Sequence, residues 1–258
     1  MKTPGMVHLV GAGPGDPELL TLRALRLIRE ADIVVHDRLV APEIMDLVPQ
    51  TVRRVYVGKA SGCHSLSQDG INKLLVSLAR QGLTVVRLKG GDPLIFGRGS
   101  EEAEMLREAG IAVDYVPGIT AAQGAASSTG VPLTHRGLAT GVRYVTGHRA
   151  ADATLELDWD SLASPDTTLV VYMGAANMAE IARELIARGL APSLPVLAIA
   201  SATTPRERCV ATRLDEAADA AAGLEAPVLF VVGAVAGLYR TSAPALTEAE
   251  PPLRMAHA

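Results

Sequence analysis

The segment VVRLKGGDPLIFGRGSEE, from Val85 to Glu102, sets bare backbone beside charged side chains. It starts with the β-branched, apolar residues of a buried strand and then changes abruptly to the turns GGDP and GRGS, before a helical pattern begins. The segment offers no obvious catalytic nucleophile. A strand that runs into a glycine turn and then into a helix indicates an α/β fold, in which ligands bind at the carboxyl ends of the strands.

The same alternation of short apolar strands and helices continues on both sides of this segment. In the first half it predicts strands at 7–10, 32–37, 52–58, 83–89 and 111–116, and helices at 17–31, 41–48, 68–82, 100–110 and 119–128. Asp16 is a plausible N-cap for the helix at 17–31, and Pro17 suits its first turn. Strands joined by helical crossovers predict a mainly parallel five-stranded sheet that is covered on both faces.

The second half is also of the α/β class. Strands are predicted at 142–147, 167–174, 195–200, 207–212 and 226–233, with helices at 176–189 and 214–223, and we expect a mixed sheet. The stretch GVPLTHRGLATG, residues 130–141, is rich in glycine and threonine and indicates a linker. We therefore predict two α/β domains, 1–132 and 133–240, with a ligand cleft between them. Residues 241–258 lack apolar periodicity, and we expect them to be disordered.

Composition excludes several classes of function. The chain of 258 residues has 48% hydrophobic and 20% charged residues, and no apolar run approaches the roughly 20 residues of a membrane span. The first residues do not resemble a signal peptide, which predicts a cytoplasmic protein. A net charge of -4 disfavours a general nucleic-acid binder. Cys63 and Cys209 form no CxxC pair and the six histidines no HExxH motif, so we predict no metal site.

The unusual residues share one position relative to the predicted strands. Each of six strands is followed by glycines or polar groups, namely GAGPGD at 11–16, His36-Asp37, Gly58-Lys59, GGDP at 90–93, PGIT at 117–120 and Met173-Gly174. Because carboxyl ends of parallel strands lie at one edge of a sheet, a single shared ligand site accounts for them better than six unrelated turns.

The motif GAGPGD on its own is weak evidence for any one ligand. It could be a tight strand-to-helix turn, or the phosphate loop of a dinucleotide-binding domain in which Asp37 would contact the ribose. The run, however, is GxGxG and lacks the third glycine of GxGxxG. A nicotinamide domain also has no need of a second glycine turn, GGDP, after its fourth strand. A nicotinamide-dependent oxidoreductase remains an alternative from a different class.

Taken together, the motifs point to one family. GAGPGDPELLTL, HDRLV, GK, RLKGGDPLIFGRGSEE, VPGITAA, GVPLTHR, TGH and YMG, in this order and spacing, resemble the tetrapyrrole (corrin and porphyrin) methylases over about residues 7–239. Within that family they most resemble the branch that methylates uroporphyrinogen III. The resemblance implies a homodimer that binds S-adenosylmethionine between its two domains and methylates carbons on two pyrrole rings of a small-molecule tetrapyrrole. The sequence departs from the usual pattern at Ser100, Ala202 and Glu207, where glycine, glycine and glutamine are more common.

The resemblance also implies a set of cofactor-binding residues. They are Pro14, Gly90, Gly91, Asp92, Ile95, Thr120, Ala121, Met173 and Ala202. Glycine suits such a site because the backbone reaches a ligand closely only where no Cβ intervenes. Met173 also fits a plainer role, since a methionine at the end of a strand is often core filler.

Five residues are candidates for acceptor binding and proton transfer within the same resemblance: Asp37, Lys59, Arg98, Glu101 and Arg136. A pyrrole carbon is enamine-like, so alignment matters more than an activated side-chain nucleophile. A base is still needed for the proton that leaves the ring, and guanidinium groups suit the carboxylates of the acceptor.

Each candidate also fits a role outside the site. Asp37 could cap the next helix, and Lys59 could be a solvated loop lysine. Arg98 and Arg136 could be surface charges. Either Glu101 or the neighbouring Glu102 could simply favour the first turn of a helix.

Other functions remain open at this point. The chain could be a methylase of the same family that acts on a later precorrin, or on another acceptor such as diphthamide or ribosomal RNA. A non-catalytic ligand-binding protein is harder to reconcile with several polar groups that converge on one site.

Overall fold

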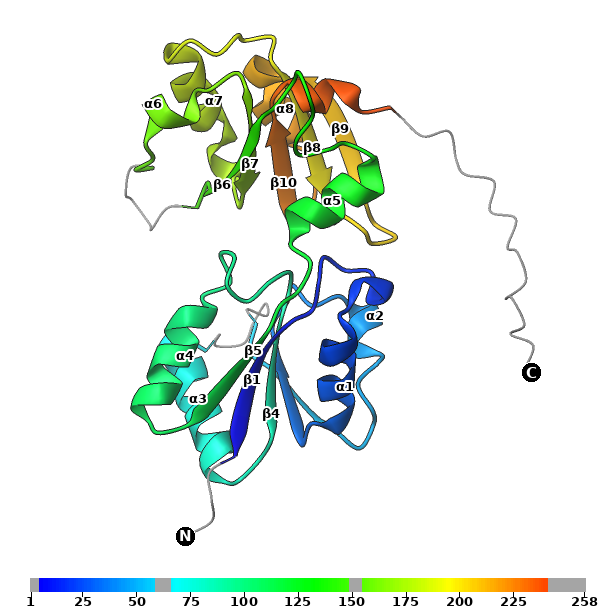
Figure 1. Cartoon of the computed structure of the whole chain (residues 1–258), viewed down its shortest axis with the longest axis vertical. Helices are drawn as coiled ribbons and strands as arrows, with labels where there is room; N and C mark the ends of the chain where they lie inside the picture. The colour runs from blue at the N-terminus through cyan, green and yellow to red at the C-terminus, as the bar shows by residue number, and fades with distance from the viewer. Residues whose placement is uncertain (1–4, 59–65, 149–154, 241–258) are drawn as a thin grey trace, which may run out of the picture.

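The computed structural model describes residues 5–58, 66–148 and 155–240 and contains two five-stranded sheets, each with its own layers of helices (Figure 1). Lys59, Cys63 and the segment 241–258 lie outside the described residues. Among the described residues, every helix is too short or too polar to cross a membrane.

The first sheet is entirely parallel, as predicted. Its strands are β1 (Met6–Gly11), β2 (Ile33–His36), β3 (Arg53–Tyr56), β4 (Val85–Lys89) and β5 (Ala112–Val116), in the order β3-β2-β4-β1-β5. The buried strand β4, which leads into the GGDP turn, therefore lies at the centre, between β2 and β1. All five strand ends that carry the unusual motifs lie along the same edge.

Helices cover both faces of this sheet. One face packs on α1 (Leu22–Glu30) and α2 (Pro42–Met45), and the other packs on α3 (Gln68–Arg80) and α4 (Gly99–Glu108). The predicted helix at 17–31 is divided: a short 3-10 turn η1 (Pro17–Leu19) is capped by Asp16, and α1 starts afresh after Thr21. The Thr21 hydroxyl accepts a hydrogen bond from the Ala24 amide, which makes it a second N-cap within one periodic stretch.

The second sheet is mixed, also as predicted. It contains β6 (Gly141–Thr146), β7 (Thr167–Tyr172), β8 (Pro195–Ala200), β9 (Arg208–Arg213) and β10 (Val228–Val232), in the order β6-β7-β10-β8-β9. Within this second sheet, β6 and β7 form the one parallel pair among the described strands, and the other pairs are antiparallel. One face packs on α7 (Met178–Ala187), α8 (Ala217–Ala221) and the short α6 (Trp159–Leu162). Three further 3-10 turns are η2 (Ala175–Asn177), η3 (Leu214–Glu216) and η4 (Ala234–Leu238).

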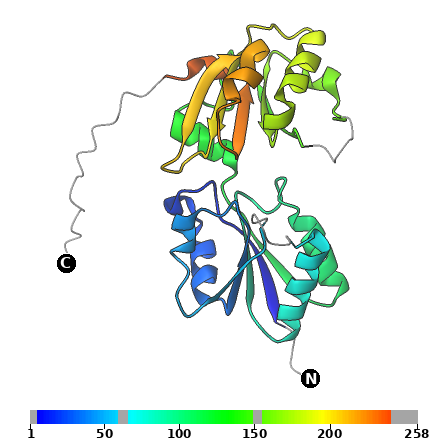
Figure 2. The same cartoon turned by 180° about the vertical axis from the view of Figure 1, so that it is seen from behind.

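Helix α5 (Ala121–Thr129) packs with the second sheet. Its buried residues Ala122 and Ala125 belong to the same core as Val170, Leu197 and other residues of that sheet. Both views show α5 beside the second sheet, after the chain has left β5 (Figure 1, Figure 2). The predicted domain boundary between residues 132 and 133 stays a prediction, and the packing of α5 is better described by a division near Gly118.

Candidate functional site

Two glycine turns are joined at the carboxyl edge of the first sheet. The Gly91 amide donates a hydrogen bond to the Gly13 carbonyl (2.7 Å), and the Gly13 amide donates one to the Gly91 carbonyl (3.2 Å). A third glycine closes the arrangement, because a Cβ on Gly118 would lie 2.2 Å from the Gly91 carbonyl oxygen. Part of the bare backbone in this region is therefore required by the close packing of the turns on one another.

Gly91 differs from its neighbour Gly90 in what surrounds it. A Cβ on Gly90 would meet Leu39 at 2.8 Å, so that glycine is needed for packing. A Cβ on Gly91 would meet nothing closer than the Ala121 amide nitrogen at 3.9 Å, and its φ is +67°. The open side of Gly91 thus faces the first turn of α5, whose N-cap is Thr120. Helix N-termini present free amide groups to a ligand.

Asp92 fixes the shape of this loop. Its Oδ1 accepts a hydrogen bond from the Leu94 amide (2.8 Å), and its Oδ2 accepts one from the Gly118 amide (3.0 Å). Both carboxylate oxygens are therefore engaged with backbone of the turns after β4 and β5. Asp92 ties the two turns together and leaves its own backbone as the group that can meet a ligand.

Left-handed backbone conformations gather in the same region. Among the described residues, those other than glycine with a φ between +49° and +64° are Phe96, Arg98, Met173, Ser201 and Thr203. They occupy the loops that follow β4, β7 and β8. Such conformations cost about 1–3 kcal/mol each, and their concentration in three loops points to a functional site.

Contacts between the two sheets bring several predicted cofactor residues together. Pro14 packs so closely on α5 that a Cβ on Gly124 would lie 2.5 Å from it. The Asp16 amide donates a hydrogen bond to Thr203 Oγ1 (3.2 Å), which places the first glycine turn beside the loop that holds the buried Ala202. Glu207, one of the departures from the usual pattern, supports that loop by accepting a hydrogen bond from the Thr203 amide.

Apolar side chains are also exposed in the loops that follow β4 and β7. Phe96 lies against Tyr172 with ring centroids 5.0 Å apart, so the loop that contains Ile95 meets the end of β7 next to Met173. Met173 is 50% exposed and has φ +54°. Neither property fits a core filler, which removes the plainer role for this residue.

A cluster of buried charged side chains lies between β4 and α4. Most of its members were not among the site residues predicted from the sequence. Arg87 and Lys89 extend from β4 toward Glu102 on α4, whose side chain is 0% exposed. Arg87 also contacts the carboxylate of Asp37, the residue that follows β2, at 3.0 Å. Burial, together with the neighbouring Arg87 cation, lowers the pKa of Lys89. The available signal was the pair of cations in VVRLK, since charged residues are rare in a central strand that is buried on both faces.

Arg98 and Glu101 form an exposed pair at the start of α4. Two hydrogen bonds, of 2.9 Å from Nε and 2.6 Å from an Nη, join the guanidinium to the Glu101 carboxylate. This pairing raises the pKa of Arg98 and lowers the pKa of Glu101. The two side chains are 54% and 52% exposed, so the pair contributes little to folding and is open to a ligand.

The two remaining acceptor candidates, Arg136 and Lys59, are not placed beside Asp37 or the Arg98–Glu101 pair by any contact in the described part of the chain. Arg136 is exposed in a turn closed by backbone hydrogen bonds between His135 and Ala139. No contact found within residues 5–58, 66–148 and 155–240 joins Arg136 to Asp37, Arg98 or Glu101. Lys59 lies outside those ranges.

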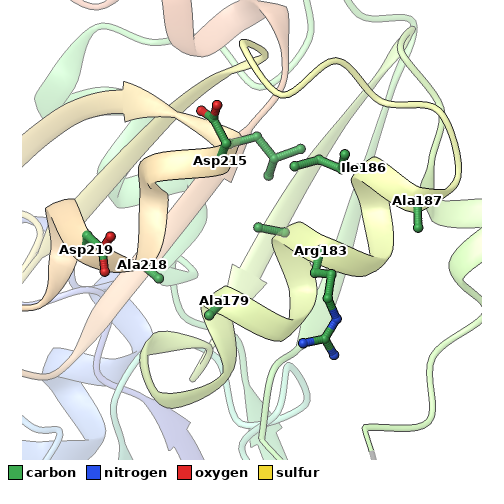
Figure 3. Close-up of a pocket in the computed structure, with 9 residues that line it drawn as sticks. Ala179, Arg183, Ile186, Ala187, Asp215, Ala218 and Asp219 are labelled. Atoms are coloured by element: carbon green, nitrogen blue, oxygen red, sulfur yellow. The ribbon is translucent and has the colours of Figure 1, made fainter.

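A surface groove elsewhere in the second half has no comparable chemistry. Figure 3 shows this groove between α7 and α8, lined by alanines and other apolar residues together with Arg183, Asp215 and Asp219. It is formed on the helices, and its lining includes none of the residues with left-handed backbone in the loops that follow β4, β7 and β8. In the described part of the chain, no three His, Cys, Asp or Glu side chains are grouped so that they could hold a metal ion.

Comparison with known proteins gives consistent matches. A family model described as Tetrapyrrole (Corrin/Porphyrin) Methylases matches residues 6–218. A protein of Paracoccus denitrificans named uroporphyrinogen-III C-methyltransferase is 65% identical over 236 residues, which are 91% of this chain and 82% of the relative. A siroheme synthase of Chromobacterium violaceum is 52% identical, and there the matched region is 91% of this chain but only 50% of the relative.

Solved structures agree in fold. The uroporphyrin-III C-methyl transferase of Thermus thermophilus, complexed with S-adenyl homocysteine, has a TM-score of 0.79 and 44% sequence identity. The match covers 91% of this chain and 100% of the solved one.

Proposed function

Because the chain belongs to the tetrapyrrole (corrin/porphyrin) methylases, we propose that it methylates uroporphyrinogen III on two pyrrole carbons, with S-adenosylmethionine as the methyl donor. The product would be precorrin-2, formed via precorrin-1. The observation that carries this proposal is the 65% identity, over 91% of the chain, to a protein with that named activity. Only about half of the siroheme synthase is matched, so its other activities are not part of the proposal.

The residues present fit the predicted methyl donor. Gly91 leaves open space beside the start of α5, where a Cβ would otherwise project. We assign the backbone of Gly91 and Asp92, together with Thr120 and Ala121, to the binding of the donor's polar groups. The remaining predicted binding residues are Pro14, Gly90, Ile95, Met173 and Ala202. When bound, S-adenosylmethionine supplies an electrophilic methyl group.

The other side chains serve the acceptor in this proposal. Pyrrole carbons are nucleophilic themselves, so the chain needs to orient the ring rather than to activate a nucleophile of its own. Arg98 and Arg136 bind ring carboxylates through paired hydrogen bonds, with Glu101 holding Arg98 until the acceptor arrives. Each new carbon–carbon bond makes the ring system cationic, and one proton must then leave the macrocycle from a methylene bridge or a pyrrole nitrogen. Asp37, a carboxylate at the sheet edge, is the candidate base, and Lys59 stays a candidate from the sequence alone.

The first test concerns the methyl donor. We expect isothermal titration calorimetry to show binding of S-adenosylhomocysteine and no binding of NAD. Binding of NAD without S-adenosylhomocysteine would contradict the proposal and favour the oxidoreductase alternative. A cytoplasmic location and a homodimeric state, both predicted from the sequence, belong to the same proposal.

A further inference from the structure

The buried cluster consists of Arg87, Lys89, Glu102 and Asp37. The side chains of the first three are 3%, 6% and 0% exposed, whereas that of Asp37 is 25% exposed. Withdrawing charges from water is costly unless they are paired, so such a cluster needs close contacts among its members. Asp37 is the one member whose carboxylate also reaches the surface.

The contacts within the cluster are unequal. Glu102 Oε1 alone accepts hydrogen bonds from Arg87 Nε (3.3 Å), Lys89 Nζ (2.8 Å) and Gln68 Nε2 (3.2 Å). Glu102 Oε2 is buried and has no hydrogen-bond partner among the described residues. Two buried cations therefore share one buried carboxylate. The carboxylate of Asp37 supplies the second negative charge.

Arg87 is the member that contacts both carboxylates. Its guanidinium is held on three sides, through Nε to Glu102, one Nη to the Leu88 carbonyl (3.0 Å) and the other Nη to Asp37 Oδ2 (3.0 Å). A planar guanidinium that donates from three of its five N–H groups in this way has a fixed orientation. The other oxygen of Asp37 accepts a hydrogen bond from the Leu39 amide (3.0 Å). Both oxygens of Asp37 are thus placed by fixed donors.

We propose that Arg87 is a positioning residue, which holds the Asp37 carboxylate in the orientation needed to take up the proton that leaves the macrocycle after each methyl transfer. The inference rests on the proposed function. In this step the methylated ring system carries a positive charge, a methylene bridge or pyrrole nitrogen next to the methylated carbon loses a proton, and Asp37 gains it. Glu102 anchors the guanidinium, Lys89 pairs with Glu102, and neither touches the ring in this step.

The test is a double-mutant cycle with Arg87→Gln and Asp37→Asn. We expect Arg87→Gln to lower kcat about 100-fold, because small displacements of a reacting group have effects of that order, with S-adenosylhomocysteine affinity within about threefold of wild type. In an Asp37→Asn background, Arg87→Gln should have almost no further effect on kcat, since residues that act through one another are not additive. Arg87→Lys, which keeps the charge but loses the planar fork, should restore only a small part of the activity.

The outcomes separate this inference from the proposed function. If the wild-type protein does not methylate uroporphyrinogen III, the proposed function fails. If it does, and the two substitutions lower kcat independently or Asp37→Asn retains full kcat, Arg87 does not act through Asp37 and the inference is wrong. Should Arg87→Gln fail to bind S-adenosylhomocysteine, the cycle is measured with Arg87→Lys, and additive losses there overturn the inference equally.

Discussion

Gly91 and Gly110 provide a matched pair of glycines. Both have a left-handed backbone, with φ of +67° and +75°. An added Cβ would meet its nearest atom at 3.9 Å at Gly91 and nothing within 4 Å at Gly110. Gly110 precedes β5 and so lies at the opposite edge of the sheet from Gly91. A substitution with alanine therefore strains the backbone similarly at both sites.

We predict that Gly91→Ala weakens S-adenosylhomocysteine binding at least about tenfold, because its Cβ enters the space assigned to the ligand, whereas Gly110→Ala does not. Calorimetry on both variants measures this, and thermal unfolding shows whether their stabilities match. Equal affinities for the two variants would remove the GGDP turn from the cofactor site.

Substitutions of Arg98 test whether this side chain binds the tetrapyrrole acceptor rather than the methyl donor. Arg98→Ala should lower kcat/KM for the tetrapyrrole at least about 30-fold, or about 2 kcal/mol, while S-adenosylhomocysteine affinity stays nearly unchanged. Arg98→Lys should recover little, because an ammonium cannot replace the paired hydrogen bonds. Arg107→Ala, on the last turn of the same helix, is the control and should retain activity. Parallel losses of activity and cofactor affinity would place Arg98 in the cofactor loop instead.

Single residues could be predicted only where their neighbours in the sequence reveal their role. Glycine turns after apolar strands indicated the region around Gly91 without any structure. The role of Arg87 could not be predicted in this way, since its partners Glu102 and Asp37 come from other elements. A role for Glu102 in the first helical turn was foreseen, yet its complete burial depends on how α4 packs on the sheet.

At the level of elements, α5 connects the two sheets. The Ala122 amide, one of the free donors in its first turn, donates a hydrogen bond to the Tyr172 hydroxyl at the end of β7 (3.1 Å). Ala122 is fully buried, so no water can replace that acceptor. The Tyr172 ring also lies against Phe96 and Tyr144.

We predict that Tyr172→Phe lowers the free energy of unfolding by about 1–3 kcal/mol, the usual effect of leaving a buried donor unpaired. Tyr144→Phe removes the same atom from a ring in the same aromatic group, and it should change the stability much less. Urea denaturation of both variants measures the difference. Equal effects would mean that the hydrogen bond to α5 contributes nothing of its own.

The strands were predictable because a short run of β-branched, apolar residues that ends at a glycine is typical of a buried strand and is too short for a helix. The ends of helices were harder to predict. The apolar periodicity of a helix continues through residues 17–31, but two N-caps, Asp16 and Thr21, divide this stretch into η1 and α1. The position of α5 could not be predicted either. Its small residues, such as Ala122 and Ala125, suit close packing against either sheet.

For the whole molecule, we predict a homodimer, as the family resemblance implies. Light scattering at micromolar concentration should give about twice the chain mass of 26.9 kDa, since closed twofold assemblies are the commonest oligomers. A stable species with the mass of one chain under those conditions would show that the homodimer prediction is wrong.

The methylation of uroporphyrinogen III by this two-sheet methylase is open to one direct measurement. It is mass spectrometry of the tetrapyrrole after incubation of the protein with uroporphyrinogen III and S-adenosylmethionine under reducing, anaerobic conditions. We predict a product that has gained two methyl groups, preceded by a transient species that has gained one. Unchanged uroporphyrinogen III, in a sample that binds S-adenosylhomocysteine and methylates a later precorrin, would contradict the assigned acceptor.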